Sequence, residues 1–348
     1  MNVVTSLASL VALVALVALA FAGSSSAATP PRTLVPEGAK LEKVFDGGCV
    51  VIEGVTSAPD GTIFFSDVTV TSLCHDEAGI FSAAGNIWRL DPATGRATIF
   101  RSPSGMSNGL KFDAAGNLLA AEGADHGGRR ITRTDLHTGR SYILTALYSG
   151  RPYNSPNDLA VDERGRIFFT DPRYEGYEPL EQLTEALYRI DPDGRVTRLV
   201  SSARKPNGIA ISPDQKTLYV IDADSGTYRV TDRETETRSR LFAYDLLSDG
   251  SIARERLLID WAAQGAGDGM CVDVAGNLYI AVHETGRQGV RIYSPQGQEI
   301  GYISTGESPA QNVGFGRGRE SHTLYIAADR GVFRITVTNA GYELPRGR

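Results

Sequence analysis

Six polar residues recur at equivalent places along the chain and are the strongest candidates for chemistry. They follow one another at intervals of 55, 49, 50, 61 and 44 residues. Two carry carboxylates and four carry amides: Glu53, Asn108, Asn157, Asn207, Asp268 and Asn312. Such oxygens suit Ca²⁺, which takes roughly six to eight oxygen ligands, better than zinc. The residue types therefore predict one divalent cation, with Ca²⁺ favoured and Mg²⁺, Mn²⁺ or Zn²⁺ left open as alternatives.

A simpler explanation of these residues is turn formation, because Asn-Gly and Asp-Gly are strong signals for hairpin turns. Four of the six do precede a glycine. However, each repeat carries its turn further along the chain, at sites such as Ala115-Gly116 and Arg164-Gly165. Asn157 and Asn312 also occupy the same place without a glycine. We therefore interpret the six residues as a convergent set.

The elements that must position this set are β-hairpins. Each of the six residues opens a short alternating run, followed by a turn and a second run of aromatic and branched residues. A second hairpin follows, as at Ile87–Pro92 and Leu187–Pro192. Four strands in about 50 residues, repeated six times, predict an all-β fold: a six-bladed β-propeller with four-stranded antiparallel blades. We expect residues 41–45 to pair with the last blade and close the ring.

The first strand of each propeller blade lines the central channel, so the six polar residues should form a ring around the axis. The second strand returns to the same face, and the residues after it should lie in loops above the ring. This predicts that His126, Arg129, Tyr174 and His283 lie near the channel mouth. For His126, a role in proton transfer and a structural hydrogen bond within the loop both stay open.

Composition narrows the class of protein. The chain has 348 residues, with 35 Lys and Arg against 41 Asp and Glu and a formal net charge of −6. Hydrophobic residues make up 41% and charged residues 22%, which is ordinary for a globular protein and excludes a disordered or fibrous chain. The acidic balance, without a long run of Lys or Arg, argues against nucleic-acid binding.

Residues 1–28 are interpreted as a signal peptide. Leu10–Ala22 is an unbroken apolar run, too short to span a bilayer, and small residues follow it. We place the cleavage near residues 22–28, a flexible segment at 29–40 and a single propeller domain at 41–345. The protein is then exported, periplasmic or secreted, without a membrane attachment. An uncleaved anchor is the alternative, because no Lys or Arg precedes the run.

Four segments carry a family resemblance over about residues 40–340. They are Asn154–Leu159 with Phe169–Pro172, Pro206–Ala210 with Ser212–Asp214, Asp268–Met270, and Gly128–Ile131. Together they resemble the gluconolactonase and senescence marker protein-30-like family of six-bladed propellers. The resemblance implies that four ring residues are the metal ligands: Glu53, Asn157, Asn207 and Asp268. It also implies second-ring or substrate contacts at Asn108 and Asn312.

Two segments depart from the family pattern. Val55 follows Glu53-Gly54 where family members often have a proline after the glycine. The segment from Glu122 to His126 is longer than usual, because a histidine commonly follows the glutamate more closely. The partner of His126 is therefore left open.

The leading functional hypothesis is a metal-dependent hydrolase that opens a sugar lactone. The metal would polarise the lactone carbonyl, and Asp268, or alternatively His126, would activate water. The expected substrate contacts are Asn108, Asn157, Arg129, Tyr174 and Asn312. Two alternatives stay open: a metal-dependent phosphotriester hydrolase, and a secreted binding propeller that uses its metal only as a brace.

Cysteine usage adds one further expectation. Cys49 precedes the first inner strand, and Cys74 follows the second strand of the same blade. Both should therefore lie on the face of the metal site. A disulfide between them is consistent with an oxidising compartment, and a free pair of thiols stays open.

Overall fold

In a computed structural model, the strands of the chain follow its sequence repeat. The structure describes residues 33–75, 78–79, 83–224, 238–262 and 265–345. The predicted signal peptide lies outside these residues. Within them, the structure contains no helix whose length and apolar character would suit a membrane span.

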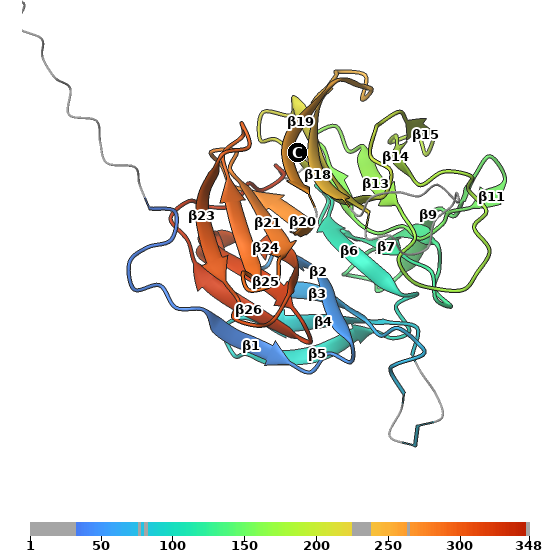
Figure 1. Cartoon of the computed structure of the whole chain (residues 1–348). Coiled ribbons are helices and arrows are strands. Elements are labelled where there is room, and N and C mark those ends of the chain that lie inside the picture. The colour runs from blue at the N-terminus through green and yellow to red at the C-terminus, as the bar shows by residue number, and fades with distance from the viewer. Residues whose placement is uncertain (1–32, 76–77, 80–82, 225–237, 263–264, 346–348) are drawn as a thin grey trace, which may run out of the picture. The chain divides into compact units, whose positions relative to one another are not determined.

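The strands form six antiparallel sheets of four strands, the blades of a six-bladed β-propeller (Figure 1). Blade 1 consists of β2 (Val51–Ser57), β3 (Ile63–Val68), β4 (Asn86–Asp91) and β5 (Arg96–Arg101). Blade 2 consists of β6 (Ser107–Phe112), β7 (Leu118–Glu122), β8 (Arg130–Thr134) and β9 (Ser141–Thr145). Blade 3 consists of β12 (Leu159–Val161), β13 (Ile167–Asp171), β14 (Ala186–Ile190) and β15 (Val196–Leu199).

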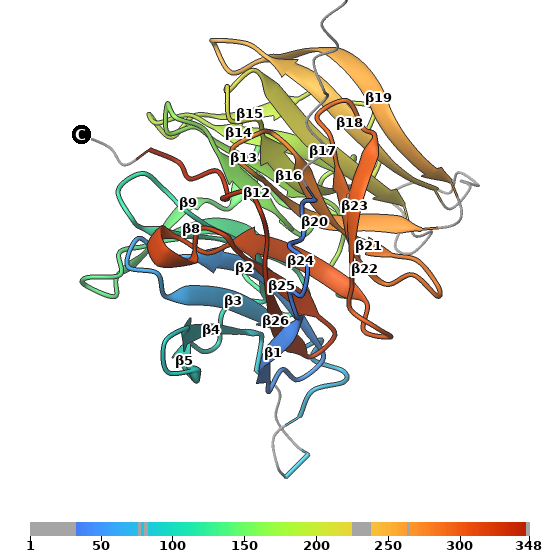
Figure 2. The ribbon, with the colours of Figure 1, turned by 90° about the vertical axis from the view of Figure 1, so that its left-hand side faces the viewer.

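The other three blades repeat this order. Blade 4 consists of β16 (Pro206–Ile211), β17 (Thr217–Asp224), β18 (Arg238–Leu246) and β19 (Ile252–Ala262), and its outer pair is the longest (Figure 2). Blade 5 consists of β20 (Ala266–Val272), β21 (Leu278–His283), β22 (Gly289–Tyr293) and β23 (Glu299–Ser304). Blade 6 consists of β24 (Ala310–Phe315), β25 (Thr323–Ala328), β26 (Gly331–Thr336) and β1 (Glu42–Asp46). A short hairpin, β10 (Leu147–Tyr148) with β11 (Arg151–Pro152), and a 3₁₀ turn at Gly318–Glu320 lie outside the blades.

Burial falls from the axis outward within a blade. Every residue of the inner strand β16 is buried, whereas the outer strand β19 is largely exposed. The reason is that neighbouring blades pack face to face: Ile221 and Leu241 of blade 4 share one core cluster with Met270 of blade 5. Both faces of the inner strands are therefore covered, and apolar and branched residues dominate them.

The ring closes through the N-terminal strand, as predicted. β1 pairs antiparallel with β26, with Glu42 opposite Arg334 (Figure 1). The Arg334 guanidinium donates to the Glu42 carboxylate at 2.9 Å. The Phe45 ring packs against Phe65 and Trp88 of blade 1. The strand therefore ties the last blade to the first.

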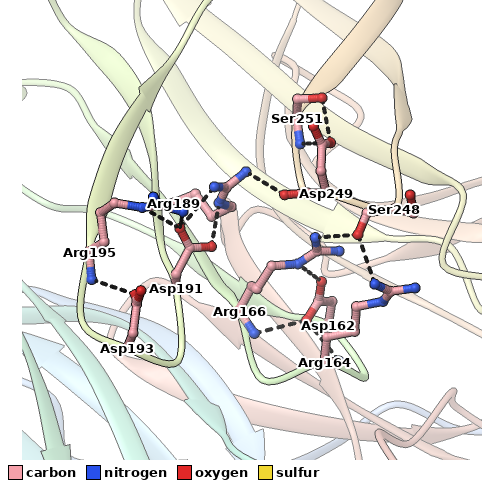
Figure 3. Close-up of polar contacts among 10 residues, drawn as sticks. All are labelled: Asp162, Arg164, Arg166, Arg189, Asp191, Asp193, Arg195, Ser248, Asp249 and Ser251. Carbon is pink, nitrogen blue, oxygen red and sulfur yellow. Dashed lines mark hydrogen bonds and ion pairs between the residues drawn. The ribbon is translucent and has the colours of Figure 1, made fainter.

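Arginine side chains of blade 3 reach the turn between β18 and β19 of blade 4 (Figure 3). Arg164 and Arg166 of blade 3 each donate to the carbonyl oxygen of Ser248, at 2.9 and 3.0 Å. Arg189 donates to the carbonyl oxygen of Asp249 at 3.0 Å. Ser248 and Asp249 lie in the turn between β18 and β19, so the carbonyls of this turn are held by the neighbouring blade.

Candidate functional site

The starts of the inner strands converge on one cavity of about 330 Å³. Five of the six predicted ring residues line it: Glu53, Asn108, Asn157, Asn207 and Asp268. In blade 6 the cavity is lined by Gln311 instead of Asn312. Asn312 is buried beside the cavity, where its amide donates to the Glu53 carboxylate at 3.4 Å. The structure thus brings the predicted set together, and the roles assigned to its members stay predictions.

A break in strand pairing places each of these side chains. In five blades the register between the first and second strand shifts at the ring residue or directly next to it, as in a β-bulge. The shifts lie at Glu53–Thr56, Ser107–Leu110, Pro206–Ile209, Gly267–Met270 and Ala310–Asn312. In blade 3 the inner strand begins only after Asn157. A bulge rotates its residue out of the sheet alternation, which lets a polar side chain face the axis while its neighbours stay in the core.

The glycines that follow the ring residues are required by close packing between blades and not by turn formation. A Cβ atom on Gly54 would lie 1.9 Å from the carbonyl oxygen of Asn108, and one on Gly208 would lie 2.1 Å from that of Asp268. Similarly, a Cβ on Gly109 would lie 2.7 Å from the carbonyl oxygen of Asn157. Each glycine therefore lets one inner strand approach the ring residue of a neighbouring blade. These glycines therefore lie where neighbouring blades come into contact near the axis.

Three acidic side chains are grouped at and next to the cavity. Burial, and next the carboxyls of Asp268 and Asp158, raise the pKa of Glu53 well above its usual value. Burial raises the pKa of Asp268 to about 6, against the opposing effects of His283 and of a hydrogen bond from Asn207. Burial likewise raises the pKa of Asp158. Three carboxyl groups thus compete for ionisation in one small region.

The donor set fits a hard cation. The buried Oδ1 atom of Asn108 and Oδ2 atom of Asp158 have no hydrogen-bond partner among the described residues. A cation would satisfy such lone pairs and offset the repulsion among the carboxylates. No group of three or more His, Cys, Asp and Glu side chains suited to a metal occurs in the described part of the chain. Amide oxygens, such as those of Asn157 and Asn207, would therefore have to complete the ligand set.

Two further predicted residues line the cavity, Tyr174 and His283. The Tyr174 hydroxyl donates to the carbonyl oxygen of Ala223 at 3.1 Å, and the Lys205 ammonium lies 4.9 Å from its ring centroid. Burial, and next the charge of Asp268, raise the pKa of Tyr174 well above its usual value, so this hydroxyl stays protonated. His283 Nε2 lies 3.5 Å from Asp268 Oδ2. Both side chains thus border the carboxylate that we predict to activate water.

His126 and Arg129 lie in the predicted loop but are not among the residues that line the cavity. The His126 side chain is exposed, and its backbone N–H donates to the Glu178 carboxylate at 2.7 Å. The Arg129 guanidinium donates to the carbonyl oxygens of Tyr153 and Pro179. Both residues therefore have structural hydrogen bonds in this arrangement, and the functional part predicted for each stays a prediction.

The protein-family model of the SMP-30/gluconolactonase/LRE-like region matches residues 51–330 of this chain. The chain belongs to this family. It is 31% identical to a gluconolactonase of Zymomonas mobilis over 70% of this chain and 65% of that protein, so it spans slightly less than two thirds of that relative's length.

Two more similar proteins are named as lactonases. A pentonolactonase, XacC of Haloferax volcanii, is 27% identical over 84% of this chain and 86% of that protein. The solved structure of XC5397 from Xanthomonas campestris, described as a gluconolactonase, superimposes with a TM-score of 0.69 at 27% identity. That superposition covers 88% of this chain and 91% of the other.

One clamp beside the cavity was not foreseen from the sequence. Asp125 is buried and accepts hydrogen bonds from the backbone N–H and the hydroxyl of Thr71, at 2.6 and 2.9 Å. Its own N–H donates to the Glu178 carboxylate at 3.1 Å. The clamp thus joins three loops, which follow β3, β7 and β13. A turn-like Gly-Ala-Asp-His-Gly segment gives no signal for such long-range contacts.

The segment Gly105–Gly109 matches the G-x-S-x-G pattern of serine hydrolases, whose serine stands on a strand-to-helix turn. Here Ser107 begins the strand β6 and is fully buried. Its hydroxyl shares a hydrogen bond of 2.9 Å with that of Ser66. Ser107 thus has neither the exposed position nor the strand-to-helix turn that such a nucleophile requires.

Cys49 and Cys74 form a disulfide, which resolves the question that the sequence left open. Cys74 lies in the loop after β3, and the cavity is lined by Val68, the last residue of β3, and by Val70 in this loop. The disulfide therefore ties a loop that borders the cavity to the beginning of blade 1.

Proposed function

We propose that this protein is a hydrolase that opens sugar lactones, as a gluconolactonase does. Its membership of the family supports this, and so do relatives that are named gluconolactonase and pentonolactonase. The observation that carries the proposal is the meeting of two carboxylates and several amides in one cavity at the propeller axis. A lactone carbonyl placed there would face a negative, oxygen-lined floor.

We propose Glu53, Asn157, Asn207 and Asp268 as the residues that hold a divalent cation, with Ca²⁺ favoured. Two carboxylates balance its charge, and two amides add oxygen ligands without excess charge. When bound, such a cation supplies Lewis-acid polarisation of the lactone carbonyl and stabilises negative charge on its oxygen.

Side chains of the protein would carry out the proton transfers. Asp268 accepts a proton from the water that attacks the carbonyl carbon, and the His283 imidazole lies 3.5 Å from that carboxylate. The bond between the carbonyl carbon and the ring oxygen then breaks. The proton passes from Asp268 to the released oxygen, which gives the open hydroxy acid.

Other residues would position the substrate. Asn108, Asn157 and Tyr174 line the cavity and offer hydrogen bonds to the hydroxyl groups of a sugar lactone. Asn312 would act through Glu53, whose carboxylate it contacts. Water activation is assigned to Asp268, because the His126 side chain does not line the cavity.

The test is hydrolysis of glucono-1,5-lactone by the purified protein, before and after treatment with a chelator and after Ca²⁺ is restored. We expect turnover that the chelator abolishes and Ca²⁺ recovers. Hydrolysis of a phosphotriester without any lactone opening would overturn the proposed substrate. A chelator that lowers thermal stability in a protein without turnover would instead indicate a binding propeller with a structural metal.

We also propose that the protein is exported to the periplasm or secreted. The Cys49–Cys74 disulfide supports this, because such bonds persist in oxidising compartments. Fractionation of cells, with detection of a shortened N-terminus in the exported fraction, is the measurement that tests it. Full-length protein in the cytoplasmic fraction alone would contradict it.

A further inference from the structure

Part of the cavity wall is apolar. Five residues of blades 1 and 2 form what we call the apolar wall: Val51, Val68, Val70, Met106 and Ala124. The same two blades contribute Glu53 and Asn108, and blades 3 to 5 carry Tyr174, Asn207, Asp268 and His283. The cavity therefore presents a hydrocarbon surface next to its oxygen-rich groups to one bound molecule.

Backbone strain marks two residues of the apolar wall. Val70 has φ of +45° and Met106 has φ of +56°, a left-handed conformation that glycine and asparagine adopt readily. A β-branched residue is rare in that region, and such conformations cost on the order of 1–3 kcal/mol each. Asparagine at either position would lower the strain, yet both positions carry apolar side chains.

Hydrogen bonds hold both residues in this conformation. The Met106 N–H donates to the carbonyl oxygen of Ala84, and its carbonyl oxygen accepts from the N–H of Gly123, both at 2.8 Å. The carbonyl oxygen of Val70 accepts from the Leu73 N–H at 2.7 Å. The next residue, Thr71, is fixed by the buried Asp125 carboxylate. The apolar wall is therefore a rigid feature of the cavity.

Charge limits what the cavity can take. Glu53, Glu175 and Asp268 line it, and no Lys or Arg occurs among its described lining residues. Away from the proposed cation, an acidic substituent on the substrate would meet acidic side chains and no basic one, which is unfavourable where water is excluded. A neutral hydrocarbon substituent would lose water contact against the apolar wall, which is favourable.

We propose that the protein also opens uncharged lactones that carry an alkyl substituent, with the alkyl chain lying against the apolar wall. This inference rests on the proposed lactonase function. The chemical step is the same: water adds to the carbonyl carbon, the acyl bond to the ring oxygen breaks, and the ring oxygen leaves as a hydroxyl. Only the binding of the substituent differs.

The test compares three six-membered lactones that differ in chain length: δ-valerolactone, δ-hexalactone and δ-octalactone. If the alkyl chain lies on the apolar wall, kcat/KM should rise by about fourfold for each methylene that becomes buried. Glucono-1,5-lactone serves as the reference substrate. Opening of glucono-1,5-lactone without any rise along the alkyl series would overturn the inference and leave the proposed function intact.

Two variants locate the effect. Val70→Asn and Met106→Asn keep a residue that tolerates the left-handed backbone but remove the hydrocarbon surface. Each should lower the ratio of kcat/KM for δ-octalactone to that for δ-valerolactone by about tenfold. Leu73→Asn is the matched control, because Leu73 lies in the same loop, is 66% exposed and does not line the cavity. It should leave the ratio at the wild-type value.

The outcomes separate the two proposals. An unchanged ratio in both wall variants, with their fold verified by circular dichroism, would overturn the role of the apolar wall. Failure to open any lactone, the sugar lactone included, would overturn the proposed function and the inference with it. A ratio that falls in the wall variants and not in Leu73→Asn would support the inference.

Discussion

At the scale of residues, Asp268 combines a raised pKa with a position at the cavity. It is a largely buried carboxyl, with 13% of its side chain exposed, its pKa is raised, and it borders a cavity together with His283 and Asn207. Charged groups are buried only at a cost, so a fold that gathers Glu53, Asp158 and Asp268 at its axis is organised around a positive ligand or a proton.

We expect Asp268→Asn to lower kcat for glucono-1,5-lactone by about 10²–10⁴-fold, since asparagine cannot accept the proton from water. It should also weaken Ca²⁺ binding, as isothermal calorimetry would show, while the β-sheet circular dichroism spectrum is retained. Asn312→Ala is an informative comparison and should reduce activity less, because Asn312 reaches the site through its hydrogen bond to the Glu53 carboxylate and does not line the cavity itself. Full activity in Asp268→Asn would remove this residue from the mechanism.

Asp171 allows a prediction about pH and stability. Burial raises its pKa to about 7, although its carboxylate accepts hydrogen bonds from the N–H groups of Asn154 and Ser155. The folded state therefore binds a proton more tightly than the unfolded state, in which the pKa is about 3.9. Between about pH 4 and pH 7, this residue makes the free energy of unfolding decrease as pH rises.

Asp171→Asn removes this titration. The variant loses hydrogen bonding at every pH, but its deficit in the free energy of unfolding relative to wild type should shrink as pH rises from 4 to 8. Urea denaturation of both proteins at several pH values measures this difference. A deficit that grows with pH would show that the Asp171 carboxylate is stabilised, and not disfavoured, by its surroundings.

At the scale of elements, the bulges at the start of the inner strands of blades 2, 4 and 5 explain both the polar residue and the glycine after it. The bulge turns the side chain toward the axis, and the missing Cβ admits the neighbouring inner strand. Blade geometry and site geometry therefore depend on the same few residues.

Gly208→Ala tests this coupling. The added Cβ would lie 2.1 Å from the carbonyl oxygen of Asp268, so the inner strands of blades 4 and 5 must separate. We expect a loss of about 3 kcal/mol in the free energy of unfolding and impaired Ca²⁺ binding. Gly194→Ala is the control: its φ is +85° but nothing lies near its Cβ, so it should cost about 1 kcal/mol and leave Ca²⁺ binding intact.

The sequence predicted much of this, for identifiable reasons. Strand alternation and turn residues are local, and their sixfold repetition was sufficient to predict the propeller and the convergence of the ring residues. Long-range contacts were harder to predict. The Asp125 clamp joins residues that are 54 positions apart. Asn312 lies beside the cavity in contact with Glu53, and Gln311 lines the cavity instead. The exposed side chain of His126 likewise depends on a loop whose path no local pattern specifies.

At the scale of the whole molecule, the ring depends on a strand from one end of the chain joining a blade built from the other. β1 covers the edge of β26, which would otherwise present unpaired backbone groups to solvent. It also carries Phe45 into the aromatic cluster with Phe65 and Trp88.

A chain that begins at Gly47 should therefore unfold at a lower urea concentration than one that begins at Thr33. Its exposed edge should also promote association, which light scattering at increasing protein concentration would detect. Equal midpoints for the two chains would show that β1 contributes little to the ring.

This closure sets an order of events during synthesis. Glu42 and its partner Arg334 are 292 residues apart, so β1 leaves the ribosome long before β26 exists. At about 5–20 residues per second, the wait is on the order of 15–60 seconds. Blades 1 to 5 can assemble during that time, but blade 6 gains its fourth strand only when translation is nearly over. The completed circle is thus a product of the finished polypeptide.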